Sequence, residues 1–376
     1  MSATPRVLVS GYYGFGNAGD EAILAGLAEG FGEAAPGVEL TVLSGDPAAT
    51  ELEHGVRAAP RGLASAYRLA REWDLLISGG GGLLQDVTSW RSPLYYLGLI
   101  RLAGAAGIPV ACVGHGVGPL RRALIRSLTQ RTLSEVGVLA VRDRVSERTL
   151  RELGVTRDVE VTADLAFLLP RPTEEAVELA RGKAGLAWDE RPRALLALRP
   201  PAVGACEGDL APDLAGAIGG ACDRVGLRPV LVAMQPARDS AFAERVAEGM
   251  SCEADVVAPG MSARELLALT AGCDLVIAMR LHALIFAAIC GIPPVAISYD
   301  AKVDALMEQL GGEPATSTNR FDADALARAV CDAWEARMEV SADLHARARG
   351  LREAAQENVD LALGLLHDRG GGGPRH

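Results

Sequence analysis

The residues Arg280, Leu281 and His282 stand where an apolar run ends and an apolar helix is predicted to begin. An arginine presents a planar fork of donors that fits a carboxylate or a phosphate, and a helix start adds backbone N–H groups and the positive end of its dipole. His282 adds a group that transfers protons near neutral pH. We predict an anion site with a proton-transfer group beside it, the alternative being a buried histidine next to a surface arginine. Lys302, after the next predicted strand, can supply another cation.

Three other polar clusters also follow apolar runs. The stretch SGGGGLLQD carries Gln85 and Asp86, which can bind hydroxyl groups or exchange protons, with loop bracing as the alternative for Asp86. His115 lies between glycines in GHGVGP and is either a ligand contact or a packing residue. Arg142 and Arg144 in VRDRVS should point to the same side of an extended chain. We expect at least one of them to reach an anion, with a local ion pair as the alternative.

The stretch GYYGFGNAGDE, residues 11–21, matches the dinucleotide-binding fingerprint in its letters. In such a site the helix start binds a pyrophosphate. Asp20 and Glu21 would place two carboxylates there, and no acid marks the end of the second predicted strand, so the sequence disfavours a nicotinamide cofactor. A glycine hairpin with polar side chains suits a polyhydroxylated ligand better, and a tight turn before a capped helix is the alternative. The candidate ligand contacts in this stretch are Tyr12, Tyr13, Asn17 and Asp20.

The elements that would position these clusters alternate along the chain. Short apolar runs alternate with stretches whose apolar residues recur at helical spacing, which is the pattern of a parallel sheet covered by helices. The pattern breaks at Pro170–Thr173 and then starts again. The predicted strands cover residues 6–10, 38–45, 74–80, 109–116, 136–143 and 159–169 before the break, and 194–200, 228–234, 254–259, 273–279 and 293–300 after it.

This order predicts an α/β protein with two Rossmann-like domains, residues 1–170 and 171–340, facing across a cleft. A long helix is expected at 341–368, and the glycine-rich tail at 369–376 is expected to be disordered. Ligands of open parallel sheets bind outside the carboxyl ends of the strands. The polar clusters lie at those ends, so we expect the chemistry in the cleft.

Composition narrows the function classes. The formal net charge of the 376-residue chain is -11, and no Lys/Arg-rich stripe with interleaved aromatic residues is present, so we expect no nucleic-acid partner. The seven cysteines are scattered without C-x-x-C spacing, which predicts buried thiols and neither disulfides nor a metal site. The first residues enter a strand without a signal sequence, and no apolar run is long enough to span a membrane. We expect a cytoplasmic protein.

The motifs together resemble the polysaccharide pyruvyl transferase family, and most closely its bacterial cell-wall (CsaB) branch. GYYGFGNAGDEAIL, SGGGGLLQD, GHGVGP, VRDRVS, TADLAF, MRLHALIFAAICGIP and ISYDAK occur in the family's order between about residues 6 and 305. The resemblance implies a GT-B-like architecture and transfer of pyruvate from phosphoenolpyruvate to a sugar as a cyclic ketal, with no cofactor besides this co-substrate. In the cell-wall branch the implied acceptor is a β-linked N-acetylmannosamine in a lipid-linked precursor of the polymer that anchors S-layer proteins.

The resemblance also implies site roles. The family's Arg-Leu-His donor site falls on Arg280, Leu281 and His282, a further donor arginine on Arg142, and the aspartate of the glycine-rich loop on Asp86. We expect His282 to be the acid, Asp86 the base, and Lys302 a further donor contact. The expected acceptor contacts are Tyr12, Tyr13, Asn17, Asp20, Gln85 and His115.

Two other function classes stay open from the sequence. A GT-B glycosyltransferase that uses a nucleotide sugar shares the architecture and would bind UDP or GDP in place of phosphoenolpyruvate. A non-catalytic sugar-binding protein would release no phosphate. Because the implied acceptor is lipid-linked, peripheral contact of the protein with the inner face of the membrane stays open. The sequence also leaves the oligomeric state open.

Overall fold

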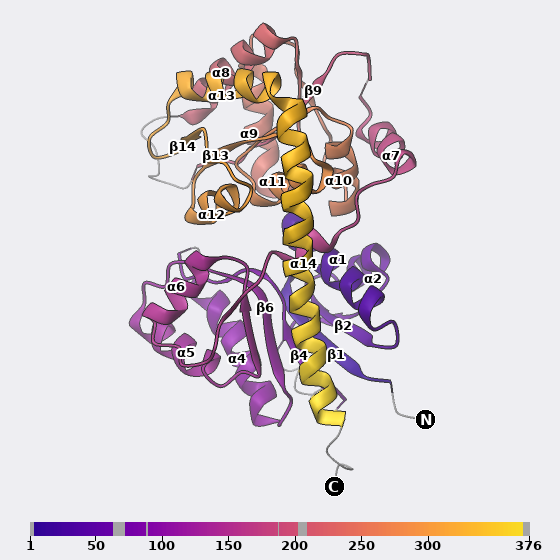
Figure 1. Ribbon diagram of the computed structural model, residues 1–376, viewed down its shortest axis with the longest axis vertical. Helices are drawn as coiled ribbons and strands as arrows, with labels where there is room; N and C mark the ends of the chain where they lie inside the picture. Colours follow the sequence, from indigo (N-terminus) through magenta and orange to yellow (C-terminus); the bar gives the residue numbers. More distant parts are fainter. Residues whose placement is uncertain (1–3, 63–71, 88, 187, 202–208, 371–376) are drawn as a thin grey trace. The chain divides into compact units, whose positions relative to one another are not determined.

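A computed structural model describes residues 4–62, 72–87, 89–186, 188–201 and 209–370 (Figure 1). The chain divides into two compact units. Unit 1 comprises Met1–Phe15, Asp20–Leu169 and Leu351–His376, and unit 2 comprises Gly16–Gly19 and Pro170–Gly350. Cys206 and residues 371–376 of the expected tail lie outside the described residues. The predicted cleft between two domains stays a prediction.

Unit 1 is built on a parallel sheet with strand order β3-β2-β1-β4-β6-β7-β8, and β5 pairs with β6 beside this path. The central strands β4 and β6 are buried along their whole length, as expected of a parallel sheet covered on both faces. The strands are β1 (Arg6–Tyr13), β2 (Glu39–Ser44), β3 (Arg57–Pro60), β4 (Leu75–Ser78), β5 (Gly81–Leu84), β6 (Val110–Val117), β7 (Val138–Val141) and β8 (Glu160–Val161).

The helices of unit 1 that the structure describes connect these strands and cover the sheet (Figure 1). They are α1 (Ala18–Ala34), α2 (Pro47–His54), α4 (Arg91–Ala105), α5 (Ala123–Leu133), α6 (Arg144–Glu152) and the 3-10 helix η1 (Leu165–Leu168). The strand expected at 159–169 is wrong beyond Val161. Asp164 accepts a hydrogen bond from the backbone N–H of Ala166 at 3.0 Å and starts η1 in its place.

Unit 2 repeats the plan with a parallel sheet in the order β11-β10-β9-β12-β13-β14. The two parallel α/β sheets confirm the predicted fold class. The strands are β9 (Arg193–Ala197), β10 (Arg228–Leu231), β11 (Asp255–Val256), β12 (Leu275–Ala278), β13 (Pro294–Ser298) and β14 (Thr316–Ser317). The helices are α7 (Glu174–Ala184), α8 (Leu210–Val225), α9 (Pro236–Glu248), α10 (Ala263–Ala271), α11 (Leu281–Cys290), α12 (Ala301–Gln309) and α13 (Ala323–Glu335).

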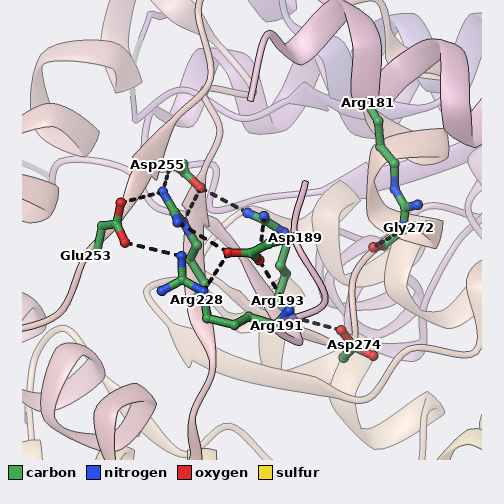
Figure 2. Close-up of polar contacts among 9 residues, drawn as sticks. All are labelled: Arg181, Asp189, Arg191, Arg193, Arg228, Glu253, Asp255, Gly272 and Asp274. Carbon is green, nitrogen blue, oxygen red and sulfur yellow. Dashed lines mark hydrogen bonds and ion pairs between the residues drawn. The ribbon is translucent and has the colours of Figure 1, made fainter. Parts of the chain in front are cut away.

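The amino ends of the strands of unit 2 are joined by an ion-pair network (Figure 2). Arg193, Arg228 and Asp255 each begin a strand, and the Asp255 carboxylate accepts from Arg193 Nη1 at 2.9 Å and from Arg228 Nε at 2.6 Å. The backbone N–H of Arg193 donates to Asp274, just before β12, at 2.8 Å. The arginines at the amino edge of the sheet are thus paired with carboxylates of the protein itself. A ligand is therefore expected at the opposite, carboxyl edge of the sheet.

One long helix, α14 (Arg337–Gly370), belongs to unit 2 up to residue 350 and to unit 1 from residue 351. It is longer at both ends than the helix expected at 341–368, and it takes in the first two residues of the expected tail. In unit 1 the buried Asn358 accepts hydrogen bonds from the backbone N–H of Gly114 at 2.8 Å and from Thr162 Oγ1 at 2.9 Å. In unit 2 the ring of His345 lies against Gly291, where a Cβ would be 2.0 Å from Cε1.

Candidate active site

The carboxyl edge of the sheet of unit 2 gathers three cations. Strands β9, β12 and β13 are neighbours in this sheet. Arg199 follows β9, Arg280 follows β12 and Lys302 follows β13 by a few residues each. Because the strands are parallel and adjacent, these residues lie at one edge, which is the expected position for a ligand of such a sheet.

Arg280 is held by a buried carboxylate. Its Nε donates to Asp239 Oδ2 at 3.0 Å and its Nη2 donates to Asp239 Oδ1. Asp239 is fully buried, and its Oδ2 also accepts from the backbone N–H of Gln235 at 2.8 Å. The two-point contact fixes the plane of the guanidinium group. It also offsets part of the positive charge, so Arg280 binds as an oriented donor more than as an uncompensated cation.

His282 stands in the first turn of α11, which receives no side-chain cap from Arg280 at its N-terminus. Its ring lies against Gly19, where a Cβ would be 2.2 Å from Nδ1. Gly19 belongs to the short segment 16–19 that clusters with unit 2, and the backbone N–H of Ala18 donates to the carbonyl of Met234 at 2.8 Å. The motif GNAGD therefore needs a glycine here because a histidine occupies the space of a side chain.

A tyrosine lies between the two other cations of this edge. The Arg199 guanidinium is 4.4 Å and Lys302 Nζ is 5.0 Å from the ring centroid of Tyr299. Burial raises the pKa of the Tyr299 phenol, but Lys302 and Arg199 outweigh it and lower the pKa below its ordinary value. Lys302 also faces Asp300 Oδ2 at 4.0 Å. Neither Arg199 nor Tyr299 was predicted as a site residue, although each lies at the carboxyl end of a predicted strand.

Arg142 lies in unit 1, whereas Arg199, Arg280 and Lys302 lie in unit 2. The side chain is buried, with Nη1 3.0 Å from Asp164 Oδ2 and Nε 3.5 Å from Asp143 Oδ2. Arg144 is 84% exposed at the start of α6. The expectation that both arginines point to the same side is wrong, because the strand ends at Val141 and a helix begins at Arg144. The pairing favours the local ion-pair alternative for Arg142, and its donor role stays a prediction.

His115 is fully buried in β6. Its Nε2 is 3.1 Å from both the carbonyl oxygen and Oγ of Ser78, so Nε2 carries the proton donated to the carbonyl. Burial lowers the pKa of His115 to about 4, and the charge of Arg142 acts in the same direction. A neutral imidazole with no exposed surface favours the packing role, and the acceptor role of His115 stays a prediction.

Asp86 is buried, and its carboxylate binds backbone N–H groups. Its Oδ1 accepts from the N–H of Arg121 and its Oδ2 from the N–H of Arg122, each at 2.8 Å. Burial raises the pKa of this carboxyl, but the two N–H groups and the nearby arginine charges outweigh it and lower the pKa. A carboxylate with both oxygens occupied and a lowered pKa is a weak base. These contacts favour the bracing alternative, and the base role stays a prediction.

The opening loop separates into a buried and an accessible part. Tyr13 is 1% exposed, and burial and the charge of Asp20 raise its pKa well above the ordinary value. Its hydroxyl fills the space beside Gly79, where a Cβ would be 2.5 Å away. Glu21 accepts from the N–H of Gly14 at 2.8 Å and thus braces the loop. The expected acceptor residues that keep part of their surface exposed are Tyr12, Asn17, Asp20 and Gln85.

One group of metal-ligand type occurs among the described residues, formed by Glu21, Glu53 and His54. Glu21 Oε2 lies 3.1 Å from His54 Nε2, and Oε1 holds the N–H of Gly14. These contacts account for Glu21 as a loop brace, and we propose no metal there. Among the described residues no helix is both long and apolar enough to cross a membrane.

Comparison with known structures identifies the class of fold. HepE of Anabaena in complex with UDP-glucose has a TM-score of 0.63 at 14% identity, over 97% of this chain and 99% of HepE. A putative UDP-N-acetylglucosamine 2-epimerase of Listeria monocytogenes has a TM-score of 0.64 at 12% identity, over 99% of each chain. At such identities the likeness concerns the fold alone, which is that of GT-B-like glycosyltransferases and epimerases.

The sequence comparison gives the family. The family model described as polysaccharide pyruvyl transferase matches residues 17–301, so the chain belongs to this family of pyruvyltransferase enzymes. The amylovoran biosynthesis protein AmsJ of Erwinia amylovora is 26% identical over 272 residues. The match covers 68% of this chain and 63% of AmsJ.

Proposed function

We propose that this protein transfers pyruvate from phosphoenolpyruvate to two hydroxyl groups of a sugar in a polysaccharide precursor, forming a cyclic ketal and releasing phosphate. The observation that carries the proposal is the carboxyl edge of unit 2. There an Arg-Leu-His turn stands at a helix start, beside two further cations at the ends of the neighbouring strands. Membership of the family supports the same reaction.

Phosphoenolpyruvate carries a carboxylate and a phosphate, and the site offers two kinds of partner for them. Arg280 presents donors in the fixed plane set by Asp239. Arg199 and Lys302 flank Tyr299 and supply two further positive charges. We assign the more diffuse charge of the phosphate to Arg199 and Lys302, and the planar carboxylate to the planar fork of Arg280. Both assignments are parts of the proposal.

His282 is the proposed acid. It gives a proton to the methylene carbon, which becomes the methyl group of pyruvate, and C2 gains positive charge. One sugar hydroxyl adds to C2 and loses its proton, the C2–O bond to phosphate breaks, and a second hydroxyl adds to C2 and loses its proton. The cations stabilise the departing phosphate. Asp86 was the expected base, but its hydrogen bonds make it a weak candidate, so we assign no base.

The acceptor is the less constrained substrate. We propose a β-linked N-acetylmannosamine in a lipid-linked cell-wall precursor, as the resemblance to the cell-wall branch implies, and hence action at the inner face of the membrane and a role in S-layer anchoring. The partly exposed polar side chains of Tyr12, Asp20 and Gln85 in unit 1 support a polyhydroxylated ligand. The acceptor role of Asn17, which belongs to unit 2, stays a prediction. AmsJ is named for amylovoran biosynthesis, so the sugar can differ between relatives.

The decisive experiment is incubation of the protein with phosphoenolpyruvate and a β-N-acetylmannosaminyl acceptor, with phosphate release and product mass as readouts. We expect one phosphate per acceptor pyruvylated. Turnover of a UDP-sugar without use of phosphoenolpyruvate would indicate a glycosyltransferase instead. Sugar binding with neither reaction would indicate a binding protein.

The role of His282 has its own test. In His282→Ala we expect turnover to fall by roughly 10²- to 10⁴-fold, because a positioned acid contributes about that much. The matched control is His367→Ala, which removes an exposed histidine of α14. Near-normal turnover of His282→Ala would refute the assignment, provided that circular dichroism shows both variants folded.

A further inference from the structure

The charges of this acidic protein are unevenly distributed along the chain. Residues 87–134 contain no aspartate and no glutamate, although the whole chain holds 48 acids. The same stretch holds six arginines and no lysine, so its formal charge is +6 in a chain of net charge -11. The arginines are Arg91, Arg101, Arg121, Arg122, Arg126 and Arg131, and all six are exposed.

The fold of unit 1 gathers this stretch on one part of its surface. Helices α4 and α5 lie in it and pack against each other (Figure 1). They follow β5 and β6, which are parallel neighbours, so both helices begin at the carboxyl edge of the sheet. Asp86 links the starts of the two helices. It precedes the loop to α4, and its carboxylate accepts hydrogen bonds from the backbone N–H groups of Arg121 and Arg122 just before α5.

Apolar side chains stand exposed among these arginines. Val87 is 52%, Trp90 45% and Leu124 64% exposed. The Arg91 guanidinium lies 5.7 Å from the Trp90 ring centroid, and Leu124 comes two residues after Arg122. We call the set Val87, Trp90, Arg91, Arg121, Arg122 and Leu124 the arginine–tryptophan surface.

This combination selects one kind of partner. Arginines near a bilayer attract anionic lipid phosphates, tryptophan prefers the membrane–water interface, and exposed aliphatic side chains gain by entering the acyl region. Nucleic acid would contact the arginines mainly through its phosphates, so the exposed aliphatic side chains beside them favour a bilayer. Asp86 is the acid nearest in sequence, and its charge is already matched by Arg122, 3.7 Å away.

We propose that the arginine–tryptophan surface binds an anionic membrane surface peripherally, with Trp90 and Leu124 inserted between lipid headgroups. The proposal rests on the charge and exposure of unit 1 and does not depend on pyruvate transfer. Binding at this surface would bring the carboxyl edge of the sheet of unit 1 close to lipid-linked molecules.

The test is co-sedimentation of the purified full chain with vesicles of phosphatidylglycerol and phosphatidylcholine in equal parts, against vesicles of phosphatidylcholine alone. We expect binding only to the anionic vesicles. The double variant Arg91→Glu/Arg121→Glu should bind at least about tenfold more weakly, because each arginine near an anionic surface contributes roughly fivefold. Trp90→Ser/Leu124→Ser should also lose binding, including the part that resists high salt.

Matched controls separate this surface from general effects. Arg328→Glu/Arg349→Glu changes the net charge equally through two exposed arginines outside unit 1, and Leu52→Ser removes an 89% exposed leucine of α2 that stands between two glutamates. Both controls should bind vesicles like the unaltered chain. Equal loss in the controls, or no binding of the unaltered chain to anionic vesicles, would overturn the proposal.

Two further readouts complete the design. Heparin and RNA should not displace the protein from vesicles at ionic strength that preserves vesicle binding; tighter binding to RNA, lost in the same variants, would reassign the surface to nucleic acid. Phosphate release with a water-soluble acceptor should be unchanged in the vesicle-binding variants. This activity assay fails or succeeds independently of vesicle binding, so it distinguishes failure of the proposed function from failure of the membrane proposal.

Discussion

At the scale of single residues, the chemistry depends on partners that fix each group. Arg280 is oriented by a carboxylate from another element, the buried Asp239 of α9. Tyr299 is flanked by Arg199 and Lys302. The residues of the proposed donor site are thus held by partners that the Arg-Leu-His motif itself does not contain.

Arg280→Lys tests the importance of the planar fork. Lysine keeps the charge but cannot make the two-point contact with Asp239, so we expect a raised KM for phosphoenolpyruvate together with a lower kcat. Arg238→Lys, at an exposed position one residue before Asp239, is the control and should change neither constant. An unchanged KM in Arg280→Lys would indicate a structural role only.

The buried His115 predicts a pH effect on stability. Its pKa is about 4 in the folded protein, whereas in the unfolded chain it is close to the ordinary value of about 6.5. Between these values only the unfolded chain takes up the proton, so stability is lost as pH falls from about 6.5 through 4, by about 3 kcal/mol from this residue. Denaturant unfolding at several pH values should show a smaller loss in His115→Gln. The control is His367→Gln, at an exposed position, which should lose as much stability as the unaltered chain. An equal loss of stability in His115→Gln and in the unaltered chain would contradict the prediction.

At the scale of elements, the site is made where strands end and helices begin. The Arg-Leu-His motif forms the N-terminus of α11, with Arg280 at the N-cap and His282 in the first turn, and the start of α1 places Gly19 against the His282 ring. One glycine of the opening motif therefore packs against the histidine of the proposed donor site. The acceptor role of the polar residues of this motif stays a prediction.

Gly19→Ala tests this contact. An added Cβ would lie 2.2 Å from His282 Nδ1, so the ring must move, and we expect turnover to fall while the protein stays folded. Gly32→Ala is the control in the same helix, because nothing lies within 4 Å of its added Cβ. It should keep full activity and gain up to about 1 kcal/mol of stability. Unchanged turnover in Gly19→Ala would show that the position of His282 is not critical.

At the scale of the whole molecule, residues far apart in sequence complete the first unit. Asn358 of α14 binds Gly114 and Thr162, more than 190 residues away along the chain. The charge distribution acts at the same scale, because the Asp86 contacts to the N–H groups of Arg121 and Arg122 bring the start of α5 beside the loop that leads to α4.

Asn358→Ala should therefore destabilise unit 1. It leaves the buried N–H of Gly114 without its acceptor, and we expect a loss of about 2 kcal/mol or more in the free energy of unfolding. Glu357→Ala, at the exposed neighbouring position, should change it by less than about 0.5 kcal/mol. Equal effects of both substitutions in denaturant unfolding would contradict a specific role for Asn358.

The sequence by itself determined the α/β class, most of the strands and the Arg-Leu-His turn, because alternating apolar periods and strand-end polar residues are local signals. It missed the short strands β3, β5 and β14, and it extended β8 into η1. Only the tertiary structure showed that Asp239 holds Arg280, that Arg199 and Lys302 flank Tyr299, and that Asp86 and His115 are engaged in buried contacts. Burial and pairing across strands depend on which segments fold together, and no local pattern of residues records that.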